Sequence, residues 1–152
     1  MSWDVEWISC IATVITAGGI VFAFQQLRLS KEIAQTQFED GLTKEYRNIL
    51  CKVPAKALLA EELSEEDYAK AFDALYRYVD LSNEQASLRQ RERIGDDVWR
   101  FWCDGIKSNL ALPAFRRAWS EIKTKRKDLF EELRQLENED FNSDPKEWGT
   151  ST

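Results

Sequence analysis

Residues 7–24 read WISCIATVITAGGIVFAF and contain no charged side chain, although 32% of the chain is charged. At a rise of about 1.5 Å per residue, a helix over this stretch would be roughly 27 Å long, which is close to the thickness of a bilayer's hydrocarbon core. Trp3 and Trp7 stand at one end and Arg28 follows the other, as residues at a membrane interface do. The stretch therefore predicts one transmembrane helix. The alternative is a buried helix of a soluble bundle.

The charges on either side of this stretch predict its orientation. Asp4 and Glu6 precede it, whereas Arg28 and Lys31 follow it. A cleaved signal peptide would begin with basic residues, so we expect an uncleaved anchor. Since basic residues stay on the cytoplasmic side of a membrane, the chain after the span is expected in the cytoplasm, as in a single-pass protein.

The rest of the chain carries apolar side chains at helical spacing and no strand-like alternation, which predicts an all-α fold. We expect a helix that continues from residue 25 to about 52 and ends before Pro54, and a short helical turn at 57–61. The expected organisation is an N-terminal tail and membrane anchor (1–26), a cytosolic helical domain (27–137) and a flexible tail (138–152).

Local signals mark the helices of this domain. Ser64 with Asp67 predicts a capped helix start, and that helix is expected to run to about residue 91. A second helix is expected after Gly95. Pro113 predicts the first turn of a last helix that continues to about residue 136. The anchor would therefore continue into a small helical bundle.

Composition excludes several kinds of chemistry. The chain has no histidine and a formal net charge of −6. Histidine-dependent catalysis and histidine metal ligands are therefore excluded, and general binding to nucleic acid is disfavoured. Cys10, Cys51 and Cys103 lie far apart and form no CxxC pair. We expect no catalytic residue, no metal site and no cofactor, and hence no enzyme.

Small side chains form a stripe within the predicted span. Ala12, Thr16, Gly19 and Ala23 follow one another at intervals of four, three and four residues, which places them on one helix face. Small faces let membrane helices approach closely and pack. The stripe predicts a homo-oligomer. The alternative is that short spans are often rich in small residues.

The segment 80–93 concentrates polar residues at the end of a helix whose other side chains look core-like. It contains Asn83, Glu84, Arg89, Arg91 and Arg93. These could form a pocket in which arginines hold a phosphate or carboxylate, which would make an anionic small molecule a ligand. A structural polar network is the favoured interpretation.

Two further groups have plain interpretations. Aromatic residues cluster at helical spacing and are expected in the core, although their faces could stack a ring: Trp99, Phe101, Trp102, Phe115 and Trp119. The basic run 123–127 could touch anionic lipid headgroups, but a solvated helix face is the favoured interpretation.

Two stretches resemble a known group of proteins. One is YVDLSNEQASLR (78–89) with Arg93 and Ile94. The other is WRFW (99–102) with GIKSNL (105–110), Pro113-Ala-Phe115 and Trp119. Together they are similar to small bacterial proteins of the DUF4760 type, over roughly residues 25–136. This resemblance implies a single-span protein of the bacterial inner membrane with a helical cytosolic domain, and it implies no activity or catalytic residue. In layout alone the chain is also similar to small transmembrane effectors of bacterial antiviral defence.

These observations lead to two main hypotheses. The first is a membrane-anchored interaction module that self-associates and disturbs the membrane or forms a pore, with the lipid bilayer, further copies and a protein as partners. The second is a sensor that binds a phosphorylated or nucleotide signal through the arginine-rich segment. An enzyme is the least favoured, because carboxylate pairs such as Glu61-Glu62 are adjacent in sequence and diverge on a helix.

Overall fold

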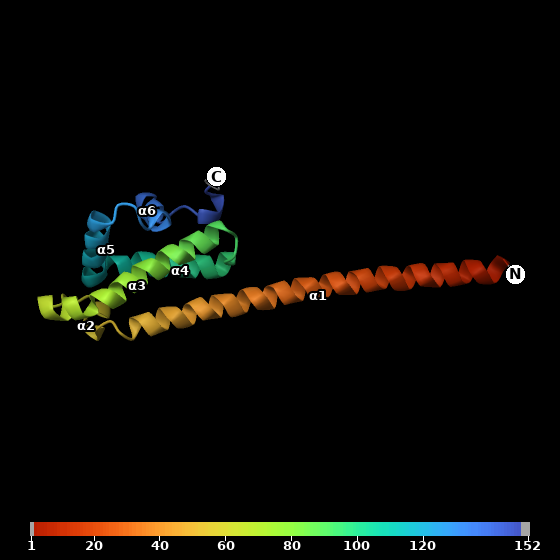
Figure 1. Cartoon of the computed structure of the whole chain (residues 1–152), viewed down its shortest axis with the longest axis horizontal. Coiled ribbons are helices and arrows are strands. Elements are labelled where there is room, and N and C mark those ends of the chain that lie inside the picture. Colours follow the sequence, from red (N-terminus) through yellow and green to blue (C-terminus); the bar gives the residue numbers. More distant parts are fainter. Residues whose placement is uncertain (1, 150–152) are drawn as a thin grey trace. The chain divides into compact units, whose positions relative to one another are not determined.

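The computed structural model describes the backbone of residues 2–149 and the side chains of residues 22–149. Within this part the chain forms helices and no strand (Figure 1), so the prediction of an all-α fold is confirmed there. The elements are α1 (Ser2–Leu50), α2 (Ala55–Leu58), α3 (Glu65–Gln90), α4 (Asp96–Ala111), α5 (Pro113–Lys125), α6 (Glu131–Asn138) and the 3-10 helix η1 (Pro145–Glu147).

The chain divides into two compact units, Met1–Phe38 and Glu39–Thr152. The boundary lies inside the continuous helix α1, further along the chain than the predicted boundary after residue 26. In the second unit, α3 contacts α5, α6 and η1, while α5 also contacts α2 and α4 (Figure 1). The helix α3 is therefore the element against which α5, α6 and η1 are placed.

The first unit is the part of α1 that holds the predicted span. Large apolar side chains in its described part are all well exposed: Phe22, Phe24, Leu27, Leu29, Ile33 and Phe38. No helix with described side chains is long and apolar enough to cross a membrane. The predicted span, residues 7–24, lies outside these described side chains except for residues 22–24.

The core of the second unit has two neighbouring clusters. The larger one combines the inner faces of α3, α5 and α6 with the end of α1, and includes Leu75, Tyr78, Phe115 and Leu133. The smaller one surrounds the indole rings of α4: Ala86, Leu88, Ile94, Trp99, Trp102, Cys103 and Leu136. The five positions predicted for the inner face of α4 are all buried: Trp99, Trp102, Cys103, Ile106 and Leu110.

The predicted helix starts are confirmed. The backbone N–H of Asp67 donates to Ser64 Oγ at 3.1 Å, so Ser64 caps α3. Pro113 occupies the first turn of α5. A backbone N–H at this position would have no acceptor within the helix, so its absence in proline costs no hydrogen bond.

The prediction of a single last helix from Pro113 to about residue 136 is wrong, because α5 ends at Lys125 and α6 begins at Glu131. Phe130 precedes α6 with a φ of 62°. Arg134 donates to the carbonyls of Lys123, Arg126 and Leu129, which satisfies the end of α5 and the turn after it. A side chain of α6 thus provides the hydrogen bonds that end α5 and hold the turn after it.

Helices α2, α3 and α6 end without glycine. Each is followed by a non-glycine residue with positive φ: Ala60 (62°), Glu92 (56°) and Asp140 (52°). After α6, Phe141 N donates to Leu136 O at 2.7 Å and Asp140 N donates to Glu137 O at 3.0 Å, the pattern of a Schellman motif. The left-handed conformation is unfavourable for residues with a Cβ atom, so local sequence gives little sign of these ends.

The prediction of a flexible tail over residues 138–152 does not hold for residues 139–149. Pro145 is almost fully buried, and Trp148 packs against the cluster around the indole rings of α4. The polar composition of this segment led to the wrong interpretation, since its polar groups bind partners in the fold.

The core position of Trp119 gives a direct test. Its side chain is 2% exposed and its ring lies 6.2 Å from that of Phe130, centroid to centroid. We expect Trp119→Ala to lower the free energy of unfolding by about 3–5 kcal/mol, because a large cavity would replace the ring. Phe101→Ala is the control, since Phe101 is 78% exposed, and it should melt like the wild type. Thermal unfolding followed by circular dichroism measures both, and equal melting of the two variants would contradict this core.

Candidate functional site

Arg89 is the centre of a buried polar network. It lies in the last turn of α3 and its side chain is 3% exposed. Its Nε donates to Asp144 Oδ1 at 2.7 Å and its Nη2 donates to Asp144 Oδ2 at 2.5 Å, which makes a two-pronged pair. Nη1 donates to the Ile94 carbonyl at 2.7 Å, and Nη2 also donates to Asp96 Oδ1 at 2.6 Å.

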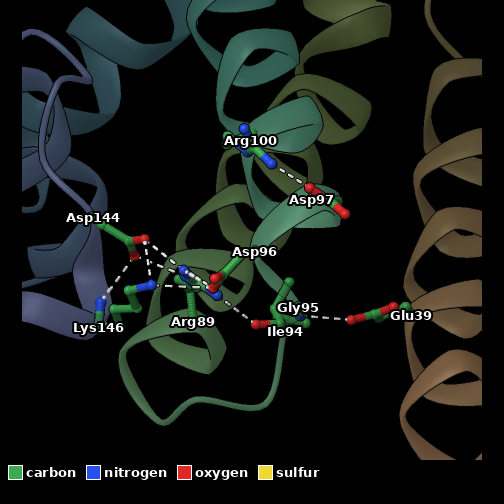
Figure 2. A network of polar contacts seen from close by, with 9 residues as sticks. All are labelled: Glu39, Arg89, Ile94, Gly95, Asp96, Asp97, Arg100, Asp144 and Lys146. Carbon is green, nitrogen blue, oxygen red and sulfur yellow. Dashed lines mark hydrogen bonds and ion pairs between the residues drawn. The ribbon is translucent and has the colours of Figure 1, made fainter. Parts of the chain in front are cut away.

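Figure 2 shows how three segments meet at this guanidinium. Asp96 comes from the start of α4, and Asp144 and Lys146 come from the C-terminal segment. Lys146 Nζ lies 3.1 Å from Asp96 Oδ1, and its backbone N–H donates to Asp144 Oδ1 at 3.1 Å. Two carboxylates thus balance two cations, the buried Arg89 and the more exposed Lys146.

The charges in this network shift one another's pKa values. Hydrogen bonding to Asp144 raises the pKa of Arg89 above its ordinary value. The pKa of Asp96 is lowered, chiefly by its hydrogen bond from Arg89. Burial acts to raise the pKa of Asp144, but the bonds from Arg89 and from the Lys146 backbone outweigh it, so this pKa is lowered too. Each shift favours the charged form, which suits a permanent ionic network.

The sequence-predicted ligand residues do not converge on one pocket. Asn83 faces α6, where its Oδ1 accepts from the Leu133 backbone N–H at 2.9 Å and its Nδ2 donates to Glu132 Oε2 at 2.9 Å. Glu84, Arg91 and Arg93 are exposed. Arg89 and Asn83 thus hold different segments of the chain against α3, as the favoured structural interpretation of these two residues expects.

A third polar contact group was not singled out from the sequence. Asn109 Nδ2 donates to Tyr78 Oη at 3.1 Å and to Tyr46 Oη at 3.3 Å, so this amide bridges helices α1, α3 and α4. Burial raises the pKa of Tyr78 well above its usual range. No local pattern marks Asn109, because its two partners are distant in sequence.

A cleft of about 520 Å³ lies between the start of α3 and the start of α5. On its wall, Arg117 makes two hydrogen bonds to Glu65, at 2.8 and 2.7 Å, and its guanidinium carbon lies 3.8 Å from the centre of the Tyr68 ring. Tyr68 Oη donates to Glu121 Oε2 at 3.0 Å. Burial, then this bond, raises the pKa of Tyr68 to about 12. These polar groups on the cleft wall are paired with one another.

The aromatic set is expected in the core and the basic run 123–127 on a solvated helix face, and the structure agrees with these expectations in part. Trp99, Trp102, Phe115 and Trp119 are buried, and Phe101 alone of this set is exposed. Within the basic run, Lys123, Lys125 and Arg126 pair with acidic residues: Glu137, Glu121 and Asp128 respectively. The cations of this run are therefore largely neutralised by the domain itself.

The predicted oligomerisation residues fall mostly outside the described side chains. Ala12, Thr16 and Gly19 lie there, and only Ala23 has a described, exposed side chain.

Comparison with protein-family models found no matching family, and comparisons with curated proteins and with solved structures found no match either. The resemblance to the DUF4760 type stays a prediction.

The two arginines of the segment 80–93 should behave differently when each is replaced. Arg89→Ala is expected to lower the free energy of unfolding by about 3–5 kcal/mol, because it leaves carboxylates without their buried partner. Arg91→Ala, the matched change at an exposed position, should alter it by less than about 0.5 kcal/mol. Urea unfolding followed by tryptophan fluorescence measures both. An Arg89→Ala variant as stable as the wild type would contradict a structural role.

Proposed function

We propose that this protein is a membrane-anchored, self-associating helical module of the bacterial inner membrane. In this proposal its N-terminal helix crosses the bilayer and its helical domain lies in the cytoplasm, where it meets partner proteins. Assembled copies disturb the membrane or form a pore. The uncharged stretch 7–24 and the small-residue stripe within it are the basis of this proposal.

The supporting structural observation is the exposure of apolar side chains of α1 at the end of that stretch and just after it. Phe24, Leu27 and Leu29 are exposed by 64%, 70% and 58%, and Phe22 and Ile33 are similarly open. Several large exposed apolar side chains on one stretch of helix are typical of a segment that contacts a membrane or another chain. A bilayer around the span and a second copy beside it would together cover these side chains.

The sensor hypothesis has less support. It places an anionic ligand on the arginine-rich segment, but four hydrogen bonds to Asp144, Asp96 and the Ile94 carbonyl occupy the guanidinium of Arg89. Arg91 and Arg93 are the exposed cations that remain for such a ligand.

Membrane insertion is tested by fractionation. The wild-type protein should sediment with inner membranes and resist carbonate extraction. Replacing both Val14 and Ile20 with Arg should release it, since each charge near the centre of a span costs about 2.5–3.5 kcal/mol. The control replaces Leu59 and Phe101, both exposed in the second unit, with Arg and should stay in the membrane fraction. A wild-type protein that is soluble without detergent would refute the proposal.

Self-association is tested by replacing each of two neighbouring glycines in turn. Gly19 shares the helix face of Ala12, Thr16 and Ala23, whereas Gly18 is turned by about 100°. Gly19→Ile should weaken association more than Gly18→Ile, because a bulky side chain separates helices that pack closely and lipid offers no compensating gain. Cross-linking or native mass measurement in detergent reports the oligomer. Equal effects would mean that the stripe does not mediate assembly, and a monomeric wild type would also exclude a pore, because a single helix cannot enclose one.

A further inference from the structure

The C-terminal segment after α6, residues 140–148, is attached to the domain in an unusual way. Every backbone–backbone hydrogen bond described for residues 141–148 has both its ends within residues 136–148. The single turn η1 is therefore the only helical part of this described segment. Only side chains and two carbonyl groups join it to α3 and α4.

The ion pairs that hold it to α3 and α4 can be named individually. Asp144 and Lys146 bind Arg89 and Asp96 (Figure 2). At its other end, Lys107 Nζ donates to the Asp140 carbonyl at 2.9 Å and lies 3.2 Å from Asp140 Oδ1.

The segment also begins with a strained backbone. Asp140 and Phe141 are consecutive residues with φ of 52° and 59°, and neither is glycine. Such conformations persist only where surrounding contacts enforce them. Backbone strain in the closed segment lowers the free energy of opening it, and such opening can be local.

The segment covers the smaller apolar cluster. Phe141 and Trp148 pack against the cluster that contains Trp99, Trp102 and Cys103. The Cys103 thiol lies 3.8 Å from the Phe141 carbonyl oxygen, and the residue is 7% exposed. Burial, followed by the charges of Asp104 and Asp144, raises the pKa of Cys103 to about 11. With the segment in place, this thiol is both covered and kept protonated, so it is unreactive.

We propose that residues 140–148 form a strap that opens as a unit while helices α3 to α6 stay folded, and that this opening controls access to the Cys103 thiol and the tryptophans beside it. The Arg89–Asp144 pair is the main fastening of the strap. When the strap opens, Asp144 becomes solvated. Cys103 then loses the segment that covers it and one nearby negative charge.

The rate at which Cys103 reacts with a thiol reagent tests this proposal. The full chain is used with Cys10→Ser, and iodoacetamide labelling is followed by peptide mass spectrometry. Cys51 is exposed and serves as the internal standard in every variant. For the wild type we expect slow labelling of Cys103 at a rate that changes little with low urea concentrations, because local opening exposes little surface.

Asp144→Asn should accelerate Cys103 labelling by about tenfold or more, as expected for losing hydrogen bonds between charged groups. Lys146→Met removes only the outer pairs and should accelerate it by about two- to fivefold, which also keeps the test valid if Asp144→Asn misfolds. Glu65→Gln is the matched control, because it weakens the two-pronged Arg117–Glu65 pair far from the strap and should leave the Cys103 rate unchanged.

Two results would overturn the proposal. One is a Cys103 rate that rises as steeply with urea as global unfolding does, since the thiol would then be exposed only in the unfolded chain. The other is an equal rate in the wild type and in both strap variants while Cys51 labels normally.

Discussion

The burial of a single guanidinium group constrains the arrangement of the helical domain. An arginine can be desolvated only where its donors find acceptors and its charge finds opposite charge. Arg89 finds them in Asp144, which is 55 residues away along the chain, and in Asp96 and the Ile94 carbonyl. With these bonds made, the end of α3, the start of α4 and the segment around Asp144 are held together, and that segment returns to α3.

The sequence predicts the interiors of the helices well and their ends less well. The aromatic side chains of α4 and α5 recur at helical spacing, and the burial of Trp99, Trp102 and Phe115 follows that pattern, although Phe101 of the same set is exposed. Ser64 and Pro113 succeed as start signals because each acts on its own turn of helix. These are local effects, and a local pattern is sufficient to predict them.

The missed features are those that depend on distant partners. The break between α5 and α6 has no proline or glycine, and it is stabilised by Arg134 and by Asn83 from another helix. Likewise Glu92 and Asp140 adopt a conformation for which sequence analysis expects glycine. Asn83 and Arg89 could be recognised as polar residues among core neighbours, but nothing nearby in the sequence identifies Glu132 or Asp144 as their partners.

The cap that Asn83 provides has a consequence for synthesis of the protein on the ribosome. Helix α6 is only eight residues long, and a helix of this length is not stable alone in water. Its first turn depends on an amide side chain that left the ribosome 50 residues earlier. While α3 is being made, Asn83 and Arg89 therefore emerge into water without their later partners, and the inner face of α3 waits for α5 and α6. The growing chain thus carries an incomplete apolar surface until the codons of its last helices have been read, and co-translational folding of this domain is completed late.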